Sequence, residues 1–285
     1  MGGITTVAAA IGAALAARLP RQNKKQREGL ALLVATALDV RDVNLMELAA
    51  ALPRAAERLD MRDQWISRRL GNPLSDTDAV MAPFAREVLA RAGAQACTPV
   101  LIIDQSQVNA AHQRVMVSLR VGGRALPLAW RVKKTPGAIG FAEQRAALQA
   151  VARLLPAGVR PTLMGDRFYG SPALIAGCRE QDWGWRLRLK QDLLVFEAGG
   201  ETTLAECFAR GEHLLREIEL TEQRVRTNVA MVHEAGHPEP WIIALSQTPS
   251  VHTAFDDGLR WGIEGAPQAQ ERKVRDELTD RAQAA

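Results

Sequence analysis

Two apolar runs that each stop on an aspartate stand out in the pattern of hydrophobic and polar positions. In the first run, residues 100–103 are all aliphatic, and Asp104 follows them directly. In the second run, residues 161–165 contain a single polar side chain and lead into Asp166. Such runs are typical of strands that are buried on both faces and hold a carboxylate firmly where they end. The alternative is an aspartate that caps the following turn, because a buried charge needs a partner or a metal ion.

Apolar positions between residues 18 and 96 recur at helical spacing. They predict four helices: one over residues 30–38, one from Asn44 to Pro53, one that ends at Leu70 and one that ends at Gly93. Residues 1–17 carry no charge, and the first basic residue, Arg18, follows their apolar run. Since a signal peptide carries its positive charge ahead of that run, we expect a helix or a frayed tail here, and no membrane span.

Residues 97–190 follow a strand pattern. Apolar and polar residues alternate over 115–121 and 126–132, and Gly122-Gly123 is typical of a hairpin turn. With the Asp104 strand, these runs predict a three-stranded antiparallel meander. The later elements are a helix over 141–155, the Asp166 strand, a helix over 172–180 and a strand over 185–190. We therefore expect an α/β fold with a mixed sheet, in which the Asp166 strand lies parallel beside the Asp104 strand and the two aspartates share a site.

The last of these strands carries a basic stripe. Arg186, Arg188 and Lys190 alternate with two leucines and therefore share one face. Beside two carboxylates, the stripe suits a phosphate backbone, and an ordinary solvated face is the alternative. For the arginines of the first 96 residues, two interpretations are likewise open: they belong to a DNA-binding module, or they lie on solvated helix faces.

The composition is that of a soluble globular protein. The chain has 285 residues, 47% of them hydrophobic and 24% charged, which argues against disorder. A net charge of +4 and a pI near 9.2 permit nucleic-acid binding without demonstrating it. Cys97, Cys178 and Cys207 have no metal-type spacing, and each adjoins an apolar segment. We expect three reduced thiols in the core, as suits a reducing cytosol.

The predicted order of strands and helices, with acids on the first and fourth strands, is that of the RNase H-like fold. Within it, the sequence resembles the DDE transposases of the insertion-sequence-four type at three motifs: Leu-Ile-Ile-Asp104-Gln-Ser, Met-Gly-Asp166-Arg-Phe-Tyr-Gly and Leu-Arg260-Trp-Gly-Ile-Glu264. The resemblance covers residues 30–264. It implies an all-α, DNA-binding region over 1–96, an RNase H-like catalytic domain over 97–264 with a β-rich insertion near 191–250, and a divergent polar tail over 265–285. Strand-like runs at 193–196, 214–220, 225–232 and 241–245 fit that insertion.

The resemblance also implies metal-dependent cleavage and transfer of DNA strands at insertion-sequence ends. Asp104, Asp166 and Glu264 would be catalytic and would hold two Mg²⁺ or Mn²⁺ ions, since two hard ions about 4 Å apart stabilise in-line displacement at phosphorus. DNA-binding residues would be Arg167, Arg186, Arg188, Lys190 and Arg260. The expected partners are terminal inverted repeats, target DNA and a second copy of the chain, in a bacterial cytoplasm where DNA binding brings the protein to the nucleoid.

The sequence beyond Glu264 departs from this family. Asp257 and Glu271 stand where the family has Tyr and Lys, and Gly265-Ala-Pro267 predicts a helix end just after the carboxylate. Residues 268–285 are polar and of mixed charge, as expected of a truncated or frame-shifted C-terminus. A second interpretation therefore stays open, in which the chain is a transposase remnant that binds DNA but no longer cleaves it.

One motif indicates a different class of enzyme. His233-Glu-Ala-Gly-His237 matches the H-E-x-x-H pattern in which two helical imidazoles bind zinc and the glutamate, here Glu234, acts as a base. Gly236 and Pro238 oppose a helix, and strand-like runs flank the motif. A hairpin loop is the favoured interpretation, and a zinc metallopeptidase is a remote alternative.

Overall fold

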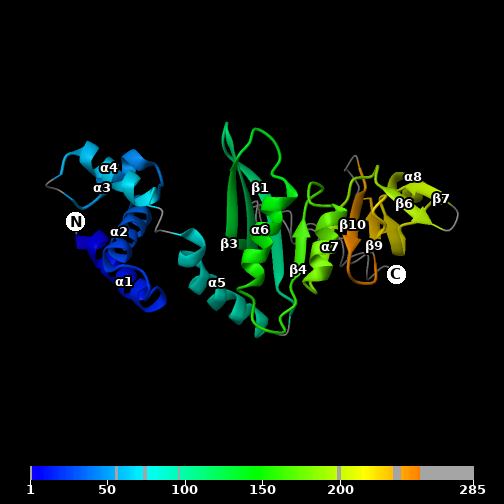
Figure 1. The fold of residues 1–285 in the computed structure, drawn as a ribbon, viewed down its shortest axis with the longest axis horizontal. Helices are drawn as coiled ribbons and strands as arrows, with labels where there is room; N and C mark the ends of the chain where they lie inside the picture. Colours follow the sequence, from blue (N-terminus) through cyan, green and yellow to red (C-terminus); the bar gives the residue numbers. More distant parts are fainter. Residues whose placement is uncertain are drawn as a thin grey trace, which may run out of the picture. The chain divides into compact units, whose positions relative to one another are not determined.

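The computed structural model describes residues 2–54, 57–72, 76–95, 97–197, 200–233 and 239–250 (Figure 1). By its internal contacts the chain divides into two units, Met1–Phe84 and Ala85–Ala285. The boundary between the units falls within a helix. It comes earlier in the chain than the boundary after residue 96, where the sequence pattern changes.

The elements described in the first unit are helices: α1 (Gly2–Arg18), α2 (Lys24–Val40), α3 (Leu45–Ala51), α4 (Leu59–Leu70) and the start of α5 (Thr77–Gly93). The uncharged N-terminal stretch is thus helical, as expected. Two asparagines begin helices: Asn23 caps α2 with a capping box, and the side chain of Asn44 accepts a hydrogen bond from the backbone of Met46 at the start of α3. One small core joins α2, α3 and α4 around Leu48 and Ile66. Another joins α1 and α2 to the first half of α5.

Several arginines of the first unit make structural contacts inside it. Arg27 donates to the backbone carbonyls of Leu19 at 3.0 Å and Gln22 at 2.9 Å, just beyond α1. The guanidinium groups of Arg54 and Arg69 lie 5.1 and 5.3 Å from the ring centroid of Trp65. Part of the basic character that suggested a DNA-binding module therefore serves to hold these helices together.

The second unit contains one mixed sheet, which confirms the predicted α/β class. Its strands are β1 (Val100–Asn109), β2 (His112–Val121), β3 (Arg124–Lys134), β4 (Thr162–Gly165), β5 (Gly184–Arg188), β6 (Leu194–Glu197), β7 (Gly200–Thr203), β8 (Leu214–Leu220), β9 (Val225–Val232) and β10 (Trp241–Leu245). Their order is β3-β2-β1-β4-β5-β10-β9-β8-β6-β7. The meander β1-β2-β3 is antiparallel, and β4 lies parallel to both β1 and β5, as predicted.

The β-rich segment 191–250 continues this sheet. Its predicted strands are confirmed in β6, β8, β9 and β10, and β10 pairs antiparallel with β5. The strand β7 and the short helix α8 (Leu204–Ala209) were not predicted. A Thr203–Glu206 capping box at the start of α8 was a sequence signal that could have revealed it.

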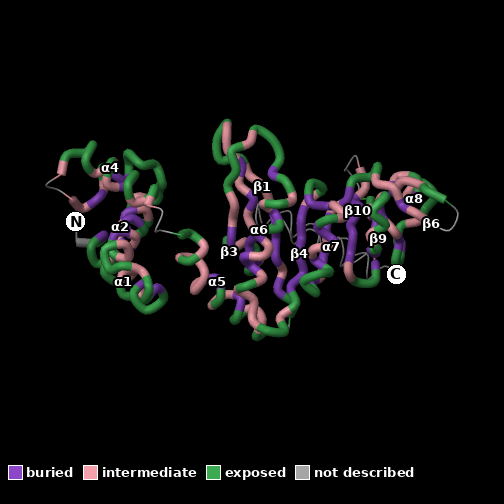
Figure 2. The backbone as a smooth tube through the Cα atoms, viewed as in Figure 1, coloured by how far each residue is buried: buried purple, intermediate pink, exposed green. Residues whose placement is uncertain are grey.

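Helices cover one face of the sheet. Leu89 of α5, Val151 of α6 (Phe141–Ala152) and Leu174 of α7 (Pro172–Glu180) join the same core as Leu101 and Ile103 of β1. α6 packs against β2 and β3, and α7 packs against β5 and β9 (Figure 1). Strands β4 and β10 are buried throughout (Figure 2). Because strand side chains alternate, the even-numbered residues of β1, with Asp104 among them, point to the opposite face.

Two expectations from the sequence are wrong. Leu126 and Val132 of β3 are exposed, and a register shift next to Leu128 puts these two side chains on opposite faces of the sheet. Cys97 is exposed, whereas Cys178 and Cys207 are buried, as expected. In the described ranges, no helix has the length and apolar character needed to span a bilayer.

Candidate functional site

The register of β1 and β4 brings the two predicted aspartates level with each other. Ile102 pairs with Met164, so two residues further along both parallel strands Asp104 comes beside Asp166. Residues with equal register on neighbouring strands point to the same face, with backbones about 4.8 Å apart. In both strands the buried run gives way to a half-buried side chain at the aspartate.

A tight turn after β4 fixes the side chain of Asp166. Asp166 Oδ1 accepts a hydrogen bond from the backbone of Phe168 at 2.8 Å, and its carbonyl accepts one from the backbone of Tyr169 at 3.0 Å. The turn then passes so close to β5 that a Cβ on Gly170 would lie 2.0 Å from the carbonyl oxygen of Arg188. Only glycine allows this approach, which joins the Asp166 turn to the end of the basic strand.

The basic stripe of β5 stands beside Asp166 on the same face. Met164 pairs with Arg186, so Asp166 comes level with Arg188. The Arg188 guanidinium lies 4.9 Å from the ring centroid of Trp241 on β10, and Arg186 Nη2 donates to Gln247 Oε1 at 3.3 Å. Lys190 is exposed and lies beyond the end of β5. Neighbouring side chains therefore hold Arg186 and Arg188 in place, whereas Lys190 is exposed to solvent beyond the end of β5.

Two further residues of this region were missed in the sequence. Arg114 of β2 pairs with Ser106 of β1, two residues beyond Asp104, and donates to its hydroxyl at 2.8 Å. The alternation of polar and apolar residues along β2 was a sequence signal for Arg114, because Arg114 has the phase of the residues on the aspartate face. Tyr169 is 1% exposed, and burial, followed by the negative charges of Asp104 and Asp166, raises the pKa of its phenol well above its ordinary value. This phenol therefore stays protonated.

Of the remaining predicted residues, the structure describes Arg167, which directly follows Asp166. Arg167 forms an ion pair with Glu239, just ahead of β10. Glu264 and Arg260 lie outside the described residues. Within the described ranges, no group of three or more His, Cys, Asp or Glu side chains converges on a metal position. The candidate metal ligands that the structure describes are the carboxylates of Asp104 and Asp166, whose hard oxygen atoms suit Mg²⁺ or Mn²⁺.

The peptidase motif lacks helical context where it is described. His233 is exposed and directly follows β9, and Trp241 of β10 pairs antiparallel with Val232, so residues 233–240 link two neighbouring strands. Glu234 and His237 lie outside the described residues.

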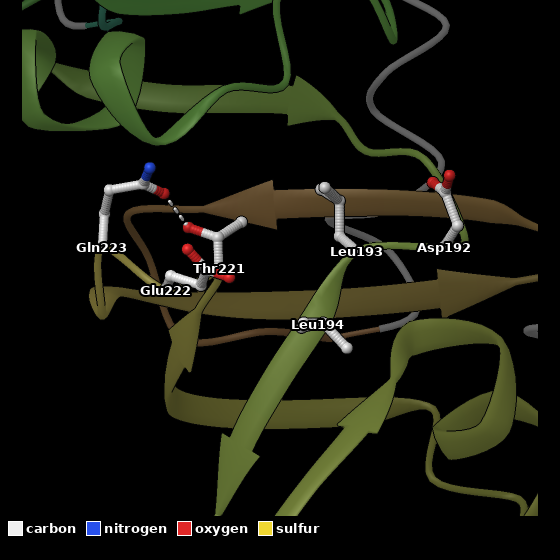
Figure 3. A pocket seen from close by; sticks show the side chains of 6 residues that line it. All are labelled: Asp192, Leu193, Leu194, Thr221, Glu222 and Gln223. Carbon is white, nitrogen blue, oxygen red and sulfur yellow. Dashed lines mark hydrogen bonds between the residues drawn. The ribbon is translucent and has the colours of Figure 1, made fainter.

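An open hollow of about 310 Å³ lies elsewhere in the sheet, among β6, β8 and their connections. Asp192, Leu193, Leu194 and residues 221–223 line it, and Figure 3 shows Gln223 bonded to Thr221 at one end and Asp192 at the other. None of the predicted site residues lines this hollow, and its two acids do not converge.

No family model matches the chain, and no curated protein matches it significantly. Among solved structures, Ciona intestinalis endonuclease V in complex with a 24mer DNA containing an inosine followed by a ribo-adenosine is 13% identical, with a TM-score of 0.35, 78% of this chain covered and 99% of that one. A variant of the same enzyme in complex with a 23mer DNA is 12% identical, with a TM-score of 0.34, 71% of this chain covered and 99% of that one. Human ENDOV is 13% identical, with a TM-score of 0.31, 70% of this chain covered and 98% of that one. These TM-scores are too low to establish a shared fold.

Proposed function

We propose that this chain is a DDE transposase of the insertion-sequence-four type, whose second unit has an RNase H-like fold and cuts and joins DNA strands with divalent metal ions. The observation that supports the proposal is the parallel register of β1 and β4, in which Ile102 pairs with Met164 and Asp104 and Asp166 each follow two residues later. Two carboxylates held close together on neighbouring strands would form a preorganised site for hard cations.

The strand arrangement supports the RNase H-like assignment. The order β3-β2-β1-β4-β5 places an antiparallel meander beside two parallel strands, and α6 and α7 provide the crossovers to β4 and β5. Asp166 follows the carboxyl end of β4, where ligands of such sheets bind, whereas β1 continues past Asp104 to Asn109, so Asp104 stands just beyond the part of β1 that pairs with β4.

The residues of the chain divide the work between ion binding and DNA binding. Asp104 and Asp166 would hold the ions, and the Asx turn at Asp166 keeps its carboxylate in one orientation. Bound divalent ions would stabilise the entering and leaving oxygens during displacement at phosphorus. Arg186 and Arg188 bind the DNA backbone on the same face, since guanidinium groups bond phosphate oxygens in pairs.

Incubation of the intact chain with supercoiled DNA that carries candidate terminal inverted repeats, in Mg²⁺ or Mn²⁺, tests this proposal. We expect nicks at the repeat ends that disappear with chelator and in Asp104→Asn and Asp166→Asn. Cleavage that persists in both variants would refute the assignment of the site.

A second candidate function is DNA binding without cleavage, which the helix-breaking Gly265-Ala-Pro267 after Glu264 favours. In that case the intact chain binds the repeat DNA but does not nick it. Replacement of residues 265–285 by a continuous helix with Lys at position 271 should then raise cleavage while DNA affinity stays the same. Strong cleavage by the unmodified chain that Glu264→Ala abolishes would exclude this second candidate.

A further inference from the structure

The half-buried guanidinium group of Arg114 on β2 has unused hydrogen-bond donors. Its Nη2 donates to Ser106 Oγ at 2.8 Å, and its Nε is buried without a hydrogen-bond partner. Within the described ranges its partner is thus a neutral hydroxyl, and no carboxylate forms an ion pair with it. A guanidinium has five N–H donors, and taking a cation out of water is unfavourable unless an anion accompanies it. Arg114 is therefore suited to bind an anion from outside the chain.

Strand register and a side-chain contact together place this guanidinium beside Asp104. Arg114 pairs with Ser106 and Met116 pairs with Asp104, in a stretch where the β1–β2 pairing is regular. Paired residues share a face of the sheet, so Arg114 points to the same side as Asp104, about 7 Å further along the strands. The bond to Ser106 Oγ then holds the guanidinium over β1, the strand that carries Asp104.

Arginines therefore flank the aspartates on both sides along the sheet. Arg188 on β5 comes level with Asp166, and Arg114 on β2 lies just beyond Asp104. Strands β1 and β4 separate β2 from β5, which makes three strand spacings, or about 14 Å. That span is too wide for a single phosphate group. A nucleic acid backbone, which repeats its phosphates along the strand, can contact both arginines and pass the carboxylates between them.

We infer that Arg114 binds a phosphate of the DNA backbone on the opposite side of the aspartate pair from Arg188, so that arginines hold the DNA on both sides of the site. Ser106 is a positioning residue, because its hydroxyl accepts one Nη2 bond and leaves the Nε and Nη1 donors for phosphate oxygens. This inference rests on the proposed function for its ligand, DNA, but it does not require a bound metal ion.

Fluorescence anisotropy of the intact chain with a duplex that carries a candidate inverted repeat, in chelator and over a range of salt concentrations, tests the inference. Arg114→Gln should weaken binding by about tenfold and reduce the slope of log affinity against log salt concentration by about one. Arg114→Lys should retain the slope, because it retains the charge. Arg145→Gln is the matched control, since Arg145 is exposed on α6, which covers the opposite face. An Arg114→Gln variant that binds like Arg145→Gln would overturn the inference.

Ethylation interference separates a phosphate contact from a structural role. In Arg114→Gln, interference should disappear at one phosphate or two neighbouring ones, and these should differ from the phosphates affected by Arg188→Gln. An even loss at every phosphate would indicate a structural role for Arg114 and overturn the inference. If Arg188→Gln lowers the salt slope and Arg114→Gln does not, DNA binding on this face stands and the inference alone fails. If the wild type binds no DNA, the proposed function fails and the inference falls with it.

Discussion

Single glycines decide how closely the turn after β4 can approach its neighbours. In Gly170→Ala, the new Cβ would lie 2.0 Å from the Arg188 carbonyl oxygen and 3.0 Å from Leu189 Cδ2. Because backbone cannot move aside as a flexible side chain can, we expect a loss of about 1–3 kcal/mol in the free energy of unfolding, measured by urea denaturation.

Gly123→Ala is the matched control for that substitution, since nothing lies within 4 Å of its Cβ position. We expect a change of at most about 0.5 kcal/mol. A Gly170→Ala variant as stable as Gly123→Ala would show that the turn does not pack on β5 as described.

The three cysteines should differ sharply in reactivity. Burial raises the pKa of the Cys178 thiol to about 12, and Cys207 is fully buried, while Cys97 is exposed. A thiol reagent at neutral pH should therefore label one cysteine in the native chain, and Cys97→Ser should abolish that labelling until denaturant is added. Labelling of the native Cys97→Ser chain would contradict the burial of the other two.

At the scale of elements, Arg62 ties α4 to the C-terminal end of α3. Its Nη1 donates to the carbonyls of Ala49 at 3.2 Å, Ala50 at 3.1 Å and Leu52 at 3.3 Å. Arg62→Ala should destabilise the first unit by about 1–2 kcal/mol, because it removes a cation and several hydrogen bonds from helix-terminal carbonyls. Faster amide hydrogen exchange in α3 would report this destabilisation.

Arg68→Ala is the control, since the described contact of Arg68 is one exposed hydrogen bond to Gln64 at 3.4 Å. Exchange in α3 should then stay at the wild-type rate. If Arg62→Ala instead left exchange unchanged and weakened DNA binding, Arg62 would be a phosphate-binding residue and not a structural one.

Local patterns predicted most elements, because their signals lie within a few residues. The spans of α7, β8, β9 and β10 follow directly from apolar periodicity and turn residues. The reversed phase of β3 depends on a register shift next to Leu128, which is a property of strand pairing. Asp104 and Asp166 were predicted because each ends an apolar run, whereas the place of Tyr169 depends on packing against Gly165, a contact that alternation along a strand does not reveal.

At the scale of the whole molecule, DNA affinity should be largely electrostatic, since the chain carries a net charge of +4 and its basic stripe borders the aspartates. If Arg186, Arg188 and Lys190 each bind one phosphate, replacing any of them with Gln should reduce the slope of log affinity against log salt concentration by about one. Fluorescence anisotropy with a DNA duplex across a range of salt concentrations measures this slope.

Arg124→Gln serves as the control for charge alone, because Arg124 is an exposed arginine at the β2–β3 turn. Its slope should match that of the wild type. A slope that falls equally in all four variants would indicate nonspecific attraction instead of a DNA-binding face.

The shared carboxylate site is tested most directly by calorimetric titration of Mn²⁺ into the intact chain and into Asp104→Asn, Asp166→Asn and the double variant. If both carboxylates hold the same ion, each single substitution should weaken binding by at least about tenfold, and the double substitution should add little to the larger single effect. Mn²⁺ affinity that survives both substitutions, or effects that add as those of independent sites do, would contradict a metal site shared by Asp104 and Asp166.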